Sequence, residues 1–506
     1  MKKLTLLLCF VSFLTKAQNI TVASGKSFTI EKTGAVTMSG NFSNAGTFTL
    51  NSDSNEFSSI IIGGSVSGNI TYNRYVNSVG TNEWDLIGAP VEGQSINSFV
   101  TANASTLASN GDAYAIGYYD NYWNEWENYT TSSNWYPFDG NFLLGMGFQM
   151  ATISGGTLKF TGAPAATNKT LPIIDFSVGQ GEGGGEGGTK WNLVANPFPS
   201  YIHGNTSADS SNNFLTINSE KLHDSYQAIY GYDADGSGYT VYNNTSAALR
   251  IAPGQAFMVA SDNPNVGNPD VLSFTTAMRT TEGDDDFIAG RNSENSFELI
   301  LKLYEGDSEI DHTKFYFGDG LGLDLDPGYD AGHFNQGASL MSRLVEEDEG
   351  VGLVINAMGI ESANDVVVPI ELNREAGNNF RISIGTFNID TAINVYLEDN
   401  VQETMTLLND QDFELTAENE LSGVGRFFIH LTETLLSIDD KIETNYLNVF
   451  KADVNNFITV EGLANQSNGT KLRLYTIRGK EVTFTTLNNT NNKQTISTQG
   501  LSTGIY

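Results

Sequence analysis

The sequence has almost no cysteine and little positive charge. Its only cysteine, Cys9, lies within the first seventeen residues, so a chain that has lost them has no disulfide, thiol chemistry or cysteine-ligated metal. Lysine and arginine total 26 against 59 acidic residues. A protein with so negative a field repels nucleic acid and anionic membrane surfaces, so we expect neither as a partner.

Long apolar runs are also missing. Near the start, Lys2 and Lys3 precede the apolar run Leu4–Leu14, and small residues lead to Ala17. This order is typical of a secretory signal peptide at 1–17, and its apolar run is too short to span a bilayer. Cleavage at about Ala17 would leave 23 basic residues against 59 acidic ones, a net charge of −36. We expect no membrane span in the mature chain.

Catalytic patterns are weak as well. The five histidines are scattered, without H-E-x-x-H or another metal-binding spacing. The G-x-S-x-G at 500–504 leaves no room for the helix that a nucleophile elbow needs, and the G-x-G-x-x-G at 179–184 lacks a strand-to-helix context. We therefore predict that the protein is not an enzyme, although 59 acids always permit some pair at a spacing suited to glycoside hydrolysis.

What the sequence does contain is the composition and periodicity of strands. Hydrophobic residues make up 40% of the chain, enough for globular cores, and frequent Gly, Asn and Thr favour sheets and turns. The fold class is predicted to be all-β, with several domains. Residues 18–76 alternate apolar and polar positions between closely spaced turns, which predicts stacked short strands in a β-solenoid-like segment. A flat meander would give a similar pattern.

The next part of the sequence contains two similar segments. EWDLIGAP at 83–90 resembles KWNLVANP at 190–197, and three further blocks match in the same order. These matches predict a duplicated β-module, with copies at 77–165 and 189–280. The region between them, 166–188, ends in the Gly-rich run GQGEGGGEGG, which is typical of a flexible linker.

An aromatic hairpin is the most unusual part of the first copy. Aromatic residues that recur in both copies at strand-like spacing are expected to pack within a hairpin. The aligned pairs are Tyr119 with Tyr232, Trp126 with Tyr239 and Tyr129 with Tyr242. The tips differ, so Tyr122 and Trp123 are predicted to be surplus to folding and exposed. The residues predicted to touch a ligand are Asn121, Tyr122, Trp123, Asn124, Glu125 and Trp126.

Two acidic loops have the carboxylate spacing that suits calcium, an oxygen-seeking cation. The first loop holds Asp233 and Asp235, and the second holds Asp324, Asp326 and Asp330. Each of these is also a good turn sequence, so a plain turn remains the alternative. No other cofactor is indicated.

The rest of the chain reads as two further β-domains. After an acidic linker at 281–294, about seven strand-like segments at 295–434 predict a β-sandwich. A small β-domain with four strands follows at 435–506.

The last segment also carries several short blocks in a recognisable order. They are Asn445–Phe450, Ile458–Leu463, Leu474–Val482 and Leu501–Tyr506. With them, 435–506 resembles the C-terminal sorting domain, type A, of cargo proteins of type IX secretion. That family continues past the Gly-Ile-Tyr block, so the resemblance implies a truncated domain. The sandwich at 295–434 resembles the module that precedes such tails in large surface proteins, through the blocks Lys314–Phe317, Asp326–Ala331, Val354–Ala357, Val368–Ile370, Tyr396–Asp399 and Arg426–His430.

This resemblance implies export by the type IX secretion machinery, which would be a partner of the C-terminal domain, and a secreted or cell-surface location. It implies no reaction. Combined with the aromatic tip, it leads to the hypothesis of an adhesin or glycan-contacting module whose aromatic rings stack on sugars. The alternatives are a purely structural stalk or matrix protein and, less favoured, a polysaccharide-acting hydrolase.

Overall fold

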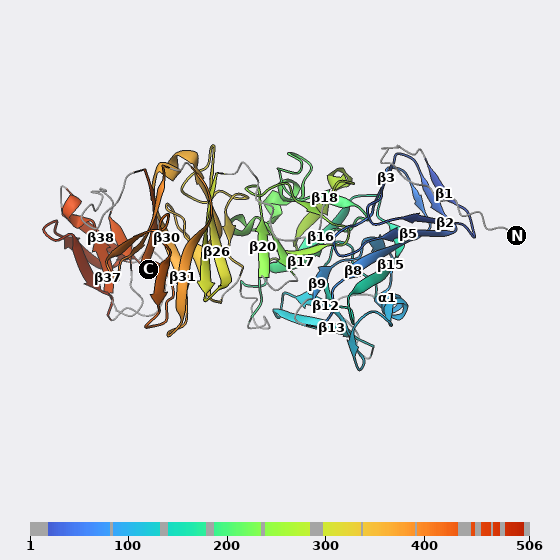
Figure 1. Ribbon diagram of the computed structural model, residues 1–506, viewed down its shortest axis with the longest axis horizontal. Coiled ribbons are helices and arrows are strands. Elements are labelled where there is room, and N and C mark those ends of the chain that lie inside the picture. Colours follow the sequence, from blue (N-terminus) through green and yellow to red (C-terminus); the bar gives the residue numbers. More distant parts are fainter. Residues whose placement is uncertain are drawn as a thin grey trace. The chain divides into compact units, whose positions relative to one another are not determined.

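The computed structural model describes most of the chain. The described residues are 19–80, 84–131, 140–178, 187–233, 238–283, 297–334, 337–389, 392–433, 447–450, 457–466, 469–475 and 481–499. The predicted signal peptide, the Gly-rich run at 179–186 and the final Gly-Ile-Tyr block lie outside them. The chain divides into two compact units, Met1–Ser293 and Glu294–Tyr506. Both consist mainly of strands, so the predicted all-β class is confirmed (Figure 1).

The first unit begins with a parallel β-solenoid, which confirms the predicted stacking of short strands. Each coil takes 22 to 24 residues, the spacing between the stacked residues Ile20, Phe42 and Val66. Its three parallel sheets are β1 (Ile20–Val22), β4 (Phe42–Asn44) and β7 (Val66–Ser67); β2 (Ser27–Ile30), β5 (Thr47–Asn51) and β8 (Ile70–Val76); and β3 (Ala35–Met38) with β6 (Ser59–Ile62). The inward apolar positions, among them Phe42 and Phe48, are buried.

The two segments that resemble each other in sequence have the same strand order. In the first segment the order is β9 (Asp85–Ile87), β14 (Phe148–Met150), β12 (Ala113–Asp120) and β13 (Glu125–Thr130), all antiparallel. In the second it is β17 (Trp191–Ala195), β22 (Ala256–Ala260), β19 (Ile229–Asp233) and β20 (Gly238–Tyr242), again antiparallel. We call these segments the first and second module.

Each module also has one short helix packed near a longer strand. The pairs are α1 (Ile96–Asn103) with β15 (Gly156–Pro164), and α2 (Phe214–Asn218) with β23 (Asp270–Phe274). The buried Asn103 donates to the carbonyl of Lys159 and accepts from its N–H. Asn218 makes the same two bonds with Ser273. A buried asparagine therefore holds helix to strand in the same way in both modules.

Equivalent contacts join the two modules to each other. The N–H of Gly88 donates to the carbonyl of Gly254 at 2.7 Å, and the N–H of Ala195 donates to that of Gly145 at 2.7 Å. Gly88 and Ala195 occupy matching positions, as do Gly145 and Gly254, whose φ values of 84° and 68° lie in the region that favours glycine. Each module thus donates to the other through the same position and accepts through the same position, as in an approximate two-fold symmetric pair.

Further short strands complete the first unit. They are β10 (Val91–Glu92), β11 (Ser109–Asn110), β16 (Lys169–Ile173), β18 (Tyr201–His203), β21 (Arg250–Ile251) and β24 (Arg279–Thr280). Strand β15 pairs with β8, so the first module continues a sheet of the solenoid. Strand β16 pairs with β23 and thereby belongs to the second module.

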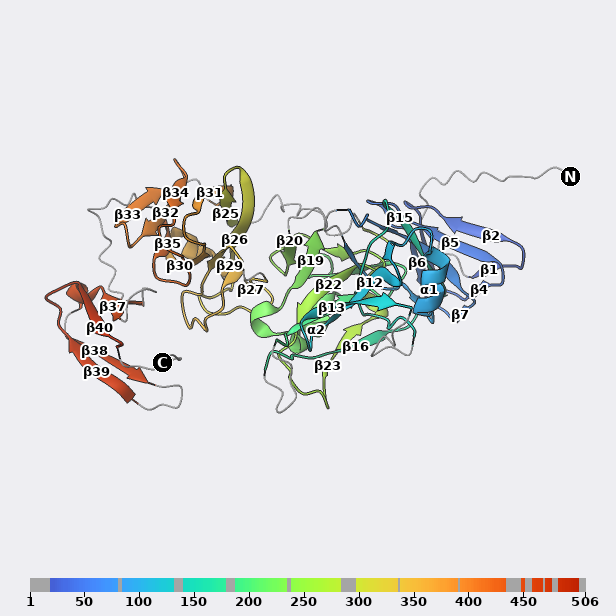
Figure 2. The ribbon, with the colours of Figure 1, turned by 90° about the horizontal axis from the view of Figure 1, so that it is seen from below.

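The second unit contains one eleven-stranded sheet around a single apolar core (Figure 2). Along the sheet the order is β33 (Thr404–Leu407), β32 (Asn394–Asp399), β35 (Phe427–Thr432), β30 (Asp365–Asn373), β28 (Ser339–Ser342), β29 (Leu353–Gly359), β26 (Ser308–Gly318), β25 (Glu298–Glu305), β31 (Asn379–Asn388) and β34 (Phe413–Thr416), with β27 (Ala331–Gly332) paired to β29. The ring of Phe413 contacts that of Phe427, so strands from distant parts of the sheet face each other. This is the architecture expected of a sandwich.

The last described strands form two small sheets. They are β36 (Asn448–Phe450), β37 (Phe457–Glu461) and β40 (Lys493–Ser497), and β38 (Thr470–Tyr475) with β39 (Glu481–Leu487). Val460, Leu463 and Leu487 form their buried cluster. In the parts of the chain that the structure covers, neither helix has the length and apolar character that a bilayer crossing requires.

Candidate functional site

The β12–β13 hairpin has one face turned to the core and one turned outward. Tyr119 lies opposite Trp126, and Tyr118 lies opposite Glu127. Because neighbouring residues of a strand point to opposite faces, these two pairs are on opposite sides of the hairpin. Tyr118 is buried in the module core, with its hydroxyl donating to Glu127, so Tyr119 and Trp126 form the outer pair. Their ring centroids are 5.3 Å apart.

Two amide side chains continue this outer face along the sheet. Asn128 of β13 and Gln149 of β14 flank Gly117, and the Gln149 Nε2 donates to the Asn128 Oδ1 at 3.0 Å. A Cβ added at Gly117 would lie 2.5 Å from that oxygen and 2.8 Å from that nitrogen. The amide pair therefore occupies space that only a glycine leaves open.

The tip of the hairpin adds a second exposed indole. The side chain of Trp123 is 51% exposed and that of Trp126 is 37% exposed, while Asn124 and Glu125 are also exposed. Asn124 has φ of 56°, and its Oδ1 accepts from the Tyr119 hydroxyl at 2.6 Å. Burial raises the pKa of Tyr119 to about 12, so this hydroxyl stays a neutral donor well above physiological pH. We call Tyr119, Trp123, Asn124, Trp126, Asn128 and Gln149 the hairpin surface.

Two of the residues predicted to touch a ligand make packing or hydrogen-bond contacts within the protein. Tyr122 was expected to be exposed, but it is half-buried and its ring packs edge-on against Phe176 with centroids 5.2 Å apart. Asn121 donates to the carbonyl of Ile174 and to the Oδ1 of Asn192. The hairpin tip is therefore anchored on the segment that leads into the second module. Aligning the sequences of the two copies could not reveal this contact. For Trp123 the expected exposure is correct.

The second module closes the equivalent face with apolar side chains. Tyr230 takes the position of Gly117, and Met258, which lies opposite Tyr230, takes that of Gln149. Tyr230 is fully buried, and its ring contacts that of Trp191 at a centroid distance of 4.7 Å. The Tyr232–Tyr239 pair repeats the outer aromatic pair at 5.4 Å. The hairpin needs the aromatic pair in both copies, but only the first copy keeps an open amide face beside it.

Tyr119, Asn128 and Gln149 were not among the sequence candidates. The two-residue period of β13 places Asn128 on the same face as Trp126, and this signal could have identified it. Gln149 comes from a different strand, so its place beside Asn128 depends on the sheet order.

The second predicted calcium loop is organised by hydrogen bonds to backbone groups. Asp330 is fully buried, and its two oxygens accept from the N–H groups of Ala357 and Asp326, each at 2.7 Å. Asp326 in turn accepts from the N–H of Gly322, while Asp324 is exposed. Burial, helped by the charges of Asp326 and Asp324, raises the pKa of Asp330 to about 7 although the two backbone hydrogen bonds lower it. Asp330 thus fixes the loop against strand β29.

The first predicted calcium loop is only partly described. Asp233 ends strand β19, opposite Gly238, and Asp235 lies outside the described residues. Within the residues that the structure covers, no group of three or more histidine, cysteine, aspartate or glutamate side chains is placed to hold a metal ion. Calcium at either loop stays a prediction.

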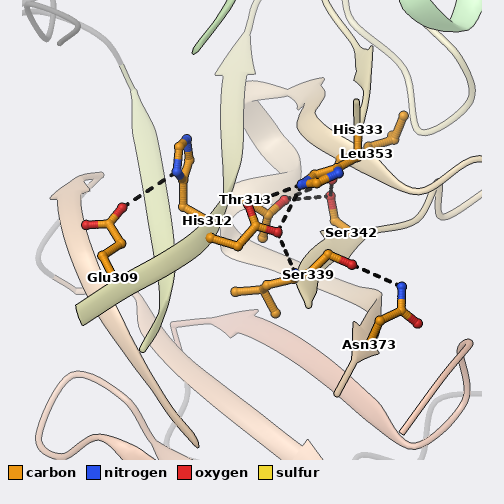
Figure 3. Close-up of polar contacts among 10 residues, drawn as sticks. Glu309, His312, Thr313, His333, Ser339, Ser342, Leu353 and Asn373 are labelled. Carbon is orange, nitrogen blue, oxygen red and sulfur yellow. Dashed lines mark hydrogen bonds and ion pairs between the residues drawn. The ribbon is translucent and has the colours of Figure 1, made fainter. Parts of the chain in front are cut away.

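A polar cluster in the second unit joins strands β26 and β28 (Figure 3). The Nε2 of His333 lies 2.9 Å from an oxygen of Asp311, and this carboxylate also accepts from the N–H of Leu340. Nearby, the hydroxyls of Thr313 and Ser342 are 3.2 Å apart, and both contact the carbonyl of Leu353. Ser339 accepts from the Nδ2 of Asn373, on β30. His312 points away from the cluster, toward Glu309. These contacts link neighbouring strands of the sheet.

Comparison with known families gives two matches, each to a different part of the chain. Residues 452–506 match the family described as the secretion system C-terminal sorting domain. The protein is therefore a cargo of type IX secretion and is secreted or carried at the cell surface. No curated protein and no solved structure matches the chain. Residues 10–430 match the family described as a domain of unknown function, DUF8693, and the chain belongs to this family.

Proposed function

We propose that this exported protein binds glycans through the hairpin surface of its first module. The observation that carries the proposal is the difference between the modules at one register position, where Gly117 leaves an open amide pair and Tyr230 closes the face. The closed face of the second module shows that this fold can pack without such groups. The open face of the first module retains polar groups and exposed indoles beyond what packing needs.

The chemistry of the hairpin surface suits a sugar ring. Trp123 and Trp126 present apolar faces that bury the C–H faces of sugars. Asn124, Asn128 and Gln149 add amide donors and acceptors that match sugar hydroxyls. A location outside the cell gives the protein access to surface polymers. This combination supports an adhesin or a glycan-contacting module, and not a stalk whose aromatic residues serve only packing.

The proposal is tested by glycan-array binding of the chain without residues 1–17, with and without calcium. We expect binding that Trp126→Ala and Trp123→Ala each reduce by about tenfold. Stacking of a nucleobase on an aromatic side chain contributes about 1–3 kcal/mol, and we expect a similar gain for the C–H face of a sugar. Phe457→Ala is the matched control, because Phe457 is 44% exposed in a different domain. Absence of binding by the folded wild-type chain would favour the purely structural alternative.

We propose that the protein binds the glycan without cleaving it. The same incubations therefore include an assay for new reducing ends in each bound polymer. Their release by the wild-type chain would favour the hydrolase alternative, and the two acids responsible would then have to lie beside the bound sugar.

A further inference from the structure

The amide pair of the hairpin surface has hydrogen-bonding groups to spare. The Gln149 Nε2 donates to the Asn128 Oδ1, and within the described parts of the chain neither side chain has another hydrogen-bond partner. Because an amide has two N–H donors and a carbonyl acceptor, the Nδ2 of Asn128 and the Oε1 of Gln149 are unused. Exchanging the roles, with Asn128 donating to Gln149, leaves the same combination. The pair thus offers a ligand one donor group and one acceptor, on neighbouring side chains.

The fold does not need this combination. In the second module Met258 takes the position of Gln149, and methionine has no N–H donor. In the first module Gly117 leaves the two amides room to meet above it. Asn128 is exposed and Gln149 is half-buried, so a ligand can reach the pair. The donor and the acceptor are therefore in place before any ligand arrives.

An indole lies next to the amide pair. Trp126 is 37% exposed and precedes Asn128 by two residues, on the same face of β13. Two residues of a strand span about 7 Å. A sugar ring stacked on Trp126 can therefore hold a ring substituent over the amide pair. The stacked ring fixes where that substituent lies, and the amides determine which substituent fits.

We infer that the glycan bound by the hairpin surface carries acetamido groups. This inference rests on the proposed glycan binding and adds the chemical class of the sugar. The carbonyl of an acetamido group accepts from Asn128 while its N–H donates to Gln149, so one substituent satisfies both unused groups. A hydroxyl has both functions on a single oxygen and matches two separate side chains less well. A protonated amine has donors alone, and it leaves the Asn128 donors without a partner.

The test uses three oligosaccharides of equal length on the chain without residues 1–17. They are β-linked oligomers of N-acetylglucosamine, glucosamine and glucose, whose rings differ in one substituent, which is acetamido, amino or hydroxyl. Calorimetric titration measures the affinity of each. We expect the acetamido form to bind about tenfold more tightly than the hydroxyl form, because it gains a second hydrogen bond to the protein. The amino form is also expected to bind more weakly than the acetamido form.

Two variants alter the amide pair with little change of shape. Gln149→Met introduces the residue type of the second module. Asn128→Asp keeps an oxygen for Gln149 to donate to but loses both N–H donors. We expect each variant to reduce the preference for the acetamido form to about twofold or less, with a thermal melt like that of the wild type. Gln411→Met, at an exposed glutamine of the second unit, is the matched control. An unchanged preference in both variants would contradict the inference.

The outcomes separate this inference from the glycan binding beneath it. Equal binding of the three forms, lost in Trp126→Ala, would overturn the acetamido preference and keep glycan binding. Binding only to array glycans that lack acetamido groups would have the same meaning. Absence of binding to every glycan would overturn both proposals. Tighter binding to an N-acetylated glycine peptide than to the acetamido sugar would also overturn the inference, because the amide pair would then recognise a polypeptide.

Discussion

Gly117 in strand β12 occupies the register position that Tyr230 occupies in strand β19. Gly117 lies opposite Gln149, and Tyr230 lies opposite Met258, in sheets with the same strand order. The tyrosine is fully buried, whereas the glycine leaves room for a half-exposed amide pair. One topology therefore supports a closed apolar face in one module and an open polar face in the other.

Filling the space above Gly117 should close the open face. In Gly117→Ala the new Cβ must displace the amides of Asn128 and Gln149, which are the ends of flexible side chains, and it lies 3.0 Å from the Glu127 carbonyl. We expect glycan affinity to fall by about tenfold through the loss of two hydrogen-bonding groups. Calorimetric titration measures the affinity, and a thermal melt monitors the fold. Gly337→Ala, at a glycine with open space, is the control. An unchanged affinity would exclude the amide pair from the binding surface.

Tyr122 and Trp123 are neighbours with different roles. The ring of Tyr122 packs on Phe176, so Tyr122→Ala should lower the free energy of unfolding by about 1–3 kcal/mol. Trp123 is half exposed. Trp123→Ala should therefore change the free energy of unfolding by less than about 1 kcal/mol while reducing glycan binding. Urea denaturation of both variants measures the difference. Equal destabilisation by the two substitutions would mean that Trp123 also serves packing.

Asn103 and Asn218 should contribute equally to stability, because they make the same bonds in the two modules. Either alanine variant leaves a part-buried N–H and carbonyl of the adjoining strand without a side-chain partner. We expect each variant to lose about 1–3 kcal/mol of unfolding free energy. Asn97→Ala, at an exposed position of α1, serves as the control. A large loss in only one of the two variants would show that the modules do not depend on the same contact.

The sequence was sufficient for what depends on local periodicity. The aligned aromatics Tyr119 and Tyr232 indeed lie in matching hairpins, each paired with a second ring. Contacts between distant segments could not be predicted this way. Tyr122 looked surplus because the second copy lacks it, yet its partner Phe176 lies outside both aligned hairpins. The local pattern around Asp330 likewise suggested calcium, which stays a prediction. It could not reveal that the N–H of Ala357, on a later strand, donates to this carboxylate.

Asp330 should make the second unit less stable as pH rises. Burial raises the pKa of its folded-state carboxyl to about 7, compared with 3.8 when it is not perturbed. Between these values the folded protein binds a proton more readily than the unfolded chain does, so the free energy of unfolding decreases with increasing pH. The stabilisation is fully present below about pH 4 and is lost as pH rises through about 7.

The Asp330→Asn variant should remove this slope, because asparagine does not titrate. It also forfeits one of the two N–H acceptors, so the variant should be less stable by an offset that does not depend on pH. Urea denaturation of both proteins across this pH range gives the difference curve. Contributions that both proteins share cancel in this difference curve. One of them comes from His312: burial lowers its pKa, so its protonation at low pH favours the unfolded chain. A difference that stays constant from acid to neutral pH would show that Asp330 is ionised throughout, and that the backbone donors outweigh its burial.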